Sequence, residues 1–142
     1  MEQPPGTPGI NVFSGLAASF DTVLGLQYTQ VTADGAHAHL DVTPDLLQPM
    51  GLVHGGVYCA VTESMASVAG FTWLAENGGG NVVGVNNNTD FLRAARSGTL
   101  HAVAEPLHRG RRQQLWLVTI SDAAGAVMSR GQVRLQNLPY ES

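Results

Sequence analysis

The longest regular pattern of hydrophobic positions in the chain covers residues 55–75, GGVYCAVTESMASVAGFTWLA. Apolar side chains occupy nearly every face at helical spacing, and the length of the run favours a helix over a strand. A helix that is apolar on all sides is a buried one. Residues 77–81, with three consecutive glycines, end the pattern. The sequence therefore predicts one long buried helix.

Alternating apolar and polar positions on both sides of this helix predict strands. Residues 26–33 and 36–43 form an expected hairpin, because the Asp34-Gly35 pair between them favours a tight turn. Further strands are expected over residues 82–91, 98–106, 113–122 and 127–135. The order predicts an α+β fold, with an antiparallel sheet of five to six strands wrapped around one long helix.

The N-terminal part of the chain has a different character. Residues 1–13 include several prolines and glycines with little to bury, and we expect a flexible arm there. Residues 14–24 carry a helical stripe, with Ser14 as N-cap and Gly25 just past the end. A chain of 142 residues makes about one domain, which we place at 14–142.

The charge content is low for a globular chain. Charged residues make up 13% of the sequence, against a usual value of ~25%, which suggests burial against another copy of the chain. The net charge of −4 argues against nucleic-acid binding. There is no lysine, and five of the seven arginines fall in one short stretch: Arg93, Arg96, Arg109, Arg111 and Arg112. Such a cluster suits a phosphorylated small molecule, although a solvated strand end explains it equally well.

The compartment follows from simple exclusions. A single cysteine excludes an intrachain disulfide framework. The N-terminus has no basic segment followed by an apolar run, so no signal peptide is expected. Glu63 and two serines interrupt the longest apolar run, which a lipid-spanning helix would tolerate badly. The prediction is a cytoplasmic protein without a membrane partner.

Candidate chemistry begins at the start of the long helix. Gly55 and Gly56 let a ligand approach the free backbone N–H groups, whose positive dipole end suits an anion or a developing oxyanion. The alternative is that the glycines only ease a sharp turn. His54 is either catalytic or holds the turn by a hydrogen bond. Gln48 can donate a second hydrogen bond to a carbonyl oxygen.

Glu63 is the unusual residue within the helix. A carboxylate on an apolar face is costly to bury unless it is paired, so Glu63 is a candidate general base or nucleophile, with a structural Glu as the alternative. Ser67 lies on the same face and is a candidate to orient the carboxylate. Its alternative role is a hydrogen bond back to its own helix.

The spacing has a consequence for the quaternary structure. Gly55 and Glu63 are eight residues apart, about 12 Å along a helix. A base and an oxyanion donor must both lie within about 3 Å of the reacting centre. Two helices related by a twofold axis would satisfy this, each contributing one group to each of two identical sites.

These residues resemble the hotdog-fold acyl-CoA thioesterases, in particular the PaaI-type group of phenylacetate degradation and the glutamate-dependent hydroxybenzoyl-CoA thioesterases. The pattern is Gln48, Gly51, His54-Gly55-Gly56 and Glu63, followed by the strand VNNNTDFLR at residues 85–93. The resemblance covers about residues 14–137. One departure is Ala94-Ala95, where the family usually has proline.

The resemblance implies a hydrolase that acts on an acyl-CoA, with an aromatic acyl group favoured by the run HGGVYCAVTES. It implies that the Gly55 amide and Gln48 polarise the thioester carbonyl, and that Glu63 of the opposite subunit attacks it or activates water, with Ser67 assisting. It implies homodimers with shared active sites, usually paired into homotetramers. Residues assigned to the coenzyme A part of the substrate are Gly56, Asn88, Arg93, Arg96 and Arg111. No separate cofactor and no metal is expected.

Three other interpretations of the function remain open. A hotdog hydratase would use a pair such as Asp34 and His39, although the Asp-Gly pair reads as a turn. A zinc site at His37 and His39 lacks further ligands. A non-catalytic acyl-CoA-binding protein would keep the glycine turn and the arginines, but it would not need Glu63. Cys59 does not face His54 on a helix and is expected to pack in the core.

Overall fold

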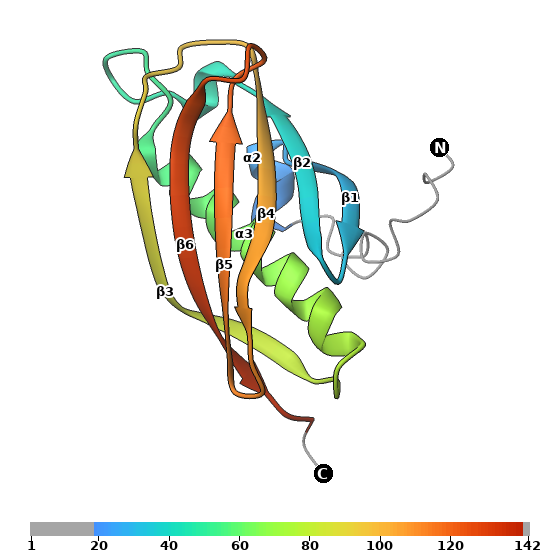
Figure 1. Ribbon diagram of the computed structural model, residues 1–142. Helices are drawn as coiled ribbons and strands as arrows, with labels where there is room; N and C mark the ends of the chain where they lie inside the picture. Colours follow the sequence, from blue (N-terminus) through green and yellow to red (C-terminus); the bar gives the residue numbers. More distant parts are fainter. Residues whose placement is uncertain (1–18, 141–142) are drawn as a thin grey trace.

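A single antiparallel sheet with one long helix against it makes up the protein (Figure 1). The computed structural model describes residues 19–140. The strands are β1 (Gln27–Thr32), β2 (Gly35–Asp41), β3 (Asn81–Phe91), β4 (Thr99–Arg109), β5 (Gln113–Ser121) and β6 (Val127–Leu138). The helices are α2 (Phe20–Leu24), the 3₁₀ turn η1 (Pro44–Leu46) and α3 (Gly55–Ala75). The strand order is β1-β2-β4-β5-β6-β3, which confirms the predicted α+β arrangement.

Helix α3 has the bounds that its hydrophobic pattern predicts. Val61, Met65 and Ala69 are fully buried against the inner face of the sheet, where Trp116 and Ile120 of β5 are also fully buried. The helix is not enclosed on every side, however, and this differs from the prediction. A stripe at Cys59, Glu63 and Ser67 is only half-buried, because one sheet face covers only one side of a helix.

The predicted hairpin is confirmed, with Asp34 in the turn between β1 and β2. Strand β4, in contrast, runs three residues beyond its predicted end at Pro106. Proline cannot donate to a sheet ladder and therefore suggests a strand end. Pro106 is tolerated because β2 pairs with β4 only as far as Ala104, and because the register with β5 shifts between Pro106 and His108.

The short N-terminal helix is confirmed in its second half. Helix α2 ends at Gly25, whose left-handed φ of 75° is readily adopted only by glycine. Its N-cap is Ser19. The predicted cap Ser14 and the predicted arm at 1–13 lie outside the described residues.

Strand β3 forms one edge of the described sheet and pairs only with β6 (Figure 1). Its other edge presents unpaired backbone groups along eleven residues. Several apolar side chains on and just after β3 are about half exposed: Val83, Val85, Phe91 and Leu92. A long, partly apolar, unpaired edge is a ready surface for another strand.

Candidate active site

The loop before α3 is tied down at both ends. Leu47 and Val53 form an isolated antiparallel bridge. The His54 amide donates to the Leu46 carbonyl at 2.9 Å, and the Val53 amide donates to the Ala95 carbonyl at 2.8 Å. These bonds fix the point at which the chain enters the helix, and so they fix the direction of the first helical N–H groups.

His54 caps the helix. Its Nδ1 accepts a hydrogen bond from the Gly56 amide at 2.8 Å. The turn-holding role, one of the two predicted for His54, is therefore present in the structure. The same bond occupies the Gly56 amide, which leaves Gly55 as the free donor of the pair.

The Gly55 amide has no hydrogen-bond partner among residues 19–140. It borders a cavity of about 370 Å³ whose lining includes Gln48, Tyr58, Phe91 and Arg93. A side chain at Gly55 would lie 2.7 Å from the ring of Phe91, which accounts for glycine at this position. A free amide at the positive end of a helix, next to an open cavity, is a site for an anion or an oxyanion.

Gln48 lines the same cavity. Its Oε1 accepts a hydrogen bond from the Met50 amide. An amide N–H can only donate, so this bond determines which end of the Gln48 side chain is the oxygen. The Nε2 group therefore remains a donor on the other side, as the proposed contact with a carbonyl oxygen requires.

Glu63 lies two turns further along α3, on its half-buried stripe. Its Oε1 accepts a hydrogen bond from Asn87 Nδ2 of β3 at 3.2 Å. Sequence reasoning assigned no role to Asn87. The sequence feature that could have indicated a role for Asn87 is the run of three asparagines inside a predicted strand, where asparagine is disfavoured. Within the described residues, Glu63 thus has a polar partner from another element of the fold.

Ser67 makes no hydrogen bond to Glu63 within the described part of the chain. The neighbouring Ser64 instead donates to Asp21 Oδ1 of α2 at 2.5 Å, which ties the short helix to the long one. Ser67 shares the half-buried stripe with Glu63, as its spacing predicts. An assisting role for Ser67 therefore stays a prediction.

Tyr58 also lines the cavity. As an aromatic residue of the long helix it is expected in the core or at an interface, and it is indeed part of the buried core. The residue is 3% exposed and its ring lies 6.0 Å from that of Phe91 between centroids. Its hydroxyl is buried and has no hydrogen-bond partner among the described residues. Burial raises the pKa of Tyr58 above its usual value.

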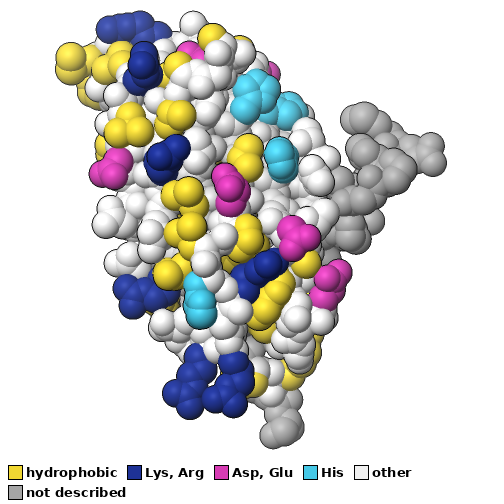
Figure 2. Space-filling model, in the orientation of Figure 1, with side chains coloured by type: hydrophobic (Ala, Val, Ile, Leu, Met, Phe, Trp, Pro, Cys, Tyr) yellow, Lys and Arg dark blue, Asp and Glu magenta, His cyan; other side chains and the backbone are white. Residues whose placement is uncertain are grey.

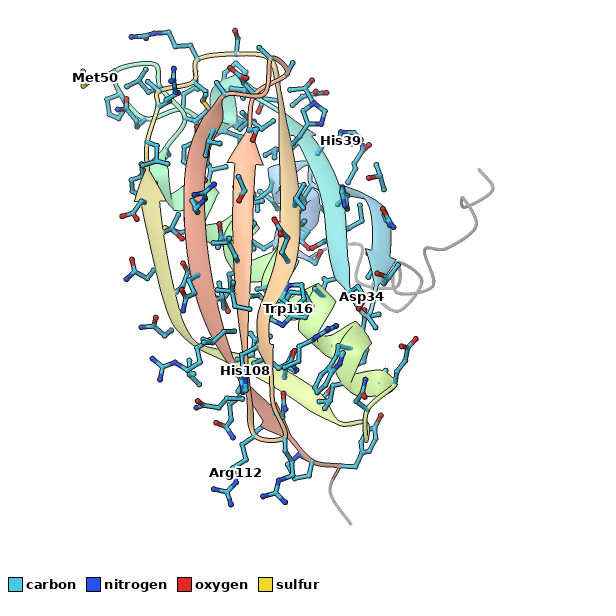
Figure 3. The ribbon with its side chains drawn as sticks, in the orientation of Figure 1. Asp34, His39, Met50, His108, Arg112 and Trp116 are labelled. Atoms are coloured by element: carbon cyan, nitrogen blue, oxygen red, sulfur yellow. The ribbon has the colours of Figure 1, made fainter. Side chains whose placement is uncertain are left out.

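Arginine side chains are spread over the visible face from one end of the molecule to the other (Figure 2). Arg93 lines the cavity, and Arg96 donates to the Met50 carbonyl at 3.1 Å. Arg111 and Arg112 are exposed in the β4–β5 turn. Figure 3 places Arg112 at the end of the molecule opposite to Met50. The predicted cluster is therefore split between the two ends of a single chain.

Arg109 and Asn88, two other candidate contacts for the phosphorylated part of the substrate, are placed unfavourably by the fold. Arg109 is occupied, because it pairs with Asp34 Oδ1 at 3.0 Å and also donates to the Ala33 carbonyl. Asn88 is exposed on the outer face of the sheet, in a depression that also involves Asn86 and Asp90. It therefore points away from the side on which Gly55 and Glu63 lie.

The hydratase reading finds no support in the structure. Asp34 lies in the hairpin turn, 87% exposed and paired with Arg109. His39 lies toward the other end of β2, where its ring is 6.4 Å from that of His101 between centroids (Figure 3). The two side chains do not form one site.

The fold and the site together define a class. A long helix whose free N-terminus opens onto a cavity, laid against a six-stranded antiparallel sheet, is the hotdog architecture. The family model of the thioesterase superfamily matches residues 50–129, and the chain belongs to this family. The enzyme is a thioester hydrolase.

Individual relatives agree with this assignment. A candidate esterase of Mycobacterium tuberculosis is 60% identical over 140 residues, 97% of each chain. Its solved structure superimposes with a TM-score of 0.84, covering 87% of this chain and 98% of the other. The 1,4-dihydroxy-2-naphthoyl-CoA hydrolase of Escherichia coli is 37% identical over 102 residues, 72% of this chain and 74% of its own. Thioesterase HI1161 of Haemophilus influenzae has a TM-score of 0.85 at 29% identity, covering 98% and 96% of the two chains.

None of the helices described here is long and apolar enough to cross a membrane.

Proposed function

We propose that the enzyme hydrolyses an acyl-CoA with an aromatic acyl group to the free acid and coenzyme A. The main support for this proposal is the Gly55 amide at the positive end of α3, which has no hydrogen-bond partner in the described part of the chain and borders the cavity that Gln48 also lines. These two donors hydrogen-bond the thioester carbonyl oxygen and stabilise the negative charge that develops on it during attack.

The attacking group is Glu63 of a second copy. In one chain, Gly55 lies beside Phe91 at one end of β3, and Glu63 lies beside Gly84 nearer the other end. A twofold axis midway, near residues 87 and 88, pairs the two β3 edges antiparallel. It brings the partner subunit's Glu63 beside Gly55 and creates two identical sites. The unpaired β3 edge and its exposed apolar side chains support this arrangement.

Two chemical routes use this carboxylate. Glu63 attacks the carbonyl carbon, expels coenzyme A as thiolate and leaves a mixed anhydride that water hydrolyses. Alternatively, it takes a proton from a water molecule that attacks the carbonyl directly. Both routes give the carboxylic acid and the thiol, and both need the carboxylate next to the carbonyl held by Gly55.

An aromatic acyl group fits the cavity wall. Phe91 and Tyr58 present two rings at an angle of 33° beside Gly55, and aromatic pairs favour such tilted or offset contacts with a further ring. The buried Tyr58 hydroxyl has no hydrogen-bond partner among residues 19–140, and a polar substituent on the ring of the acyl group would give it one. The Escherichia coli relative named above hydrolyses a dihydroxynaphthoyl thioester.

Cationic groups for the coenzyme A phosphates are available at the cavity mouth. Arg93 lines the cavity and Arg96 lies next to the Met50 loop. Arg111 and Arg112 lie in the β4–β5 turn at the opposite end of each chain, where Figure 3 labels Arg112. The proposed twofold axis therefore also brings the partner subunit's Arg111 to this end. Guanidinium groups suit phosphate oxygens because they donate two parallel hydrogen bonds.

The first test is thiol release from benzoyl-, hydroxybenzoyl-, phenylacetyl- and aliphatic acyl-CoA thioesters. Glu63→Gln should lose at least about 100-fold in kcat, since it removes the attacking group. Glu76→Gln is the matched control, because Glu76 is exposed just past the far end of α3. Equal rates for Glu63→Gln and the wild type would overturn the assignment of Glu63, and a preference for aliphatic thioesters would overturn the substrate class.

The shared site has a test of its own. The Glu63→Gln variant lacks the attacking group, and the Gln48→Ala variant lacks a donor to the carbonyl oxygen. In the proposed site these two groups come from different subunits. Co-assembled subunits should regain about a quarter of wild-type activity, because half of the dimers are mixed and each mixed dimer has one intact site. If the mixture remains as inactive as its components, both groups come from one subunit.

A further inference from the structure

We propose that Asn87, seated in a β-bulge of β3, is a positioning residue that holds the Glu63 carboxylate in its reactive orientation. This inference rests on the proposed function of Glu63. Asn87 is not among the residues that line the cavity at Gly55, and it reaches the proposed site through its hydrogen bond to Glu63.

The bulge turns Asn87 toward the helix. In the first part of β3, Val82 and Gly84 are the half-buried residues, in ordinary alternation. Val85 and Asn86 are then both exposed, and the register with β6 shifts between Gly84 and Asn86. After the shift the half-buried positions are Asn87 and Thr89. One extra residue therefore moves the middle asparagine of three onto the face that carries Glu63.

The orientation of the Asn87 amide is fixed by its partners. Its Nδ2 lies 3.0 Å from the Cys59 carbonyl, which can only accept a hydrogen bond. The second Nδ2 hydrogen is then directed to Glu63 Oε1 at 3.2 Å. Thr89 Oγ1 donates to Asn87 Oδ1 at 2.7 Å and completes the set. Every polar hydrogen of the amide is used, and one of them is on the carboxylate.

Gly84 supplies the space on the other side of the carboxylate. A Cβ atom at this position would collide with Glu63 Oε2. The backbone of Gly84 is not in the left-handed region, so nothing but the lack of a side chain calls for glycine here. Asn87 holds one carboxylate oxygen, and the missing side chain of Gly84 leaves room for the other.

This cradle lies on the edge strand at which the second copy docks. An attacking oxygen must meet the carbonyl carbon within a few tenths of an ångström, and a displacement of 1 Å can lower the rate about 100-fold. A free glutamate side chain samples several rotamers. The hydrogen bond from Asn87 and the space left by Gly84 together favour one rotamer of Glu63, so the carboxylate is already oriented when substrate binds.

The experiment compares Asn87→Ala and Gly84→Ala with the matched control Asn86→Ala, whose side chain lies on the outer face of the same strand. We expect kcat to fall about 10-fold to 100-fold in the first two variants, with KM within about twofold of the wild type. Asn86→Ala should keep the wild-type kcat. A purely structural role for Asn87 would lower the amount of folded protein and leave kcat per folded site unchanged, and that result would overturn the proposal.

A second readout works without turnover. In protein labelled with ¹³C at the glutamate carboxyl carbon, the Glu63 signal is identified as the one missing from Glu63→Gln. It should shift in Asn87→Ala and stay in place in Asn86→Ala. An unchanged signal in Asn87→Ala overturns the positioning role. If the wild type hydrolyses no thioester, the proposed function fails, and the carboxyl signal alone decides on the contact.

Discussion

The replacement of Gln114 by leucine tests the buried polar network beneath the far half of α3. Gln114 is 0% exposed on β5. Its Nε2 donates to the Gly70 carbonyl at 3.2 Å and to Asn137 Oδ1 at 2.8 Å, and its Oε1 accepts from Trp116 Nε1 at 2.8 Å. The network thus joins the helix, β5 and β6 at one point. Leucine keeps most of the volume and removes all three bonds.

The size of the effect follows from the groups left behind. The Gly70 carbonyl belongs to a helix and keeps its place in the helical ladder. The Trp116 indole N–H and the Asn137 side-chain oxygen Oδ1 lose a buried partner, at about 1–3 kcal/mol each. Leucine burial offsets part of this, so we expect a loss of about 2–4 kcal/mol in the free energy of unfolding. With about 2.1 cal/mol/K of unfolding entropy per residue, Tm falls by roughly 7–13 °C.

The assay is urea unfolding followed by tryptophan fluorescence and by circular dichroism. The protein concentration is kept fixed, because the stability of the proposed dimer would depend on it. Gln132→Leu is the control, since Gln132 is exposed on the outer face of β6. It should change stability by no more than about 0.5 kcal/mol. A loss below about 1 kcal/mol for Gln114→Leu would refute the reasoning that the stranded groups are costly.

Two further predictions concern charge and pH. Asp34→Ala should cost no more than about 1 kcal/mol in urea unfolding, despite its ion pair with Arg109, because Asp34 is 87% exposed and solvent screens the pair; a larger loss would contradict this. Burial raises the pKa of Tyr28, with Asp21 adding to the effect, and burial also raises the pKa of Tyr58. Above pH 10 the unfolded phenols ionise while the folded ones keep their protons, so the stabilising contribution of these two tyrosines is constant below pH 10 and is lost above it. Equal urea midpoints at pH 8 and pH 10.5 would contradict the assignment.

Helix α3 illustrates what local pattern can predict. Its apolar positions repeat over twenty-one residues, it begins at Gly55-Gly56, and three glycines follow shortly after its last residue, Ala75. Periodicity and helix punctuation depend on neighbouring residues only, so both ends were predictable. The hairpin turn at Asp34 was predictable for the same reason. Of the candidate site, the free amide at Gly55 and the cap at His54 follow equally from short-range rules.

Asn87 illustrates what local pattern misses. Its inward direction depends on a register shift against β6, a strand more than forty residues later. Simple alternation places Asn86 and Asn88 on the face of Gly84, and Asn87 on the opposite one. The extended end of β4 beyond Pro106 likewise depends on where β2 stops. Both the direction of the Asn87 side chain and the end of β4 depend on how strands pair in the folded protein, which the local sequence does not specify.

The strand order also determines at which stage of synthesis on the ribosome the β-sheet of this enzyme can be completed. Within the described sheet, β3 has no partner except β6, and Asn81 pairs with Leu138 near the end of the chain. The apolar helix and β3 therefore emerge from the ribosome well before β6, the strand with which β3 pairs. Pairing between strands so far apart in the sequence is a slow folding step. Strand β3, which carries Gly84 and Asn87 beside the Glu63 carboxylate, gains its described sheet partner only when β6 is in place. A nascent chain that stalls before β6 thus carries every residue of the candidate site and still lacks the support that aligns them.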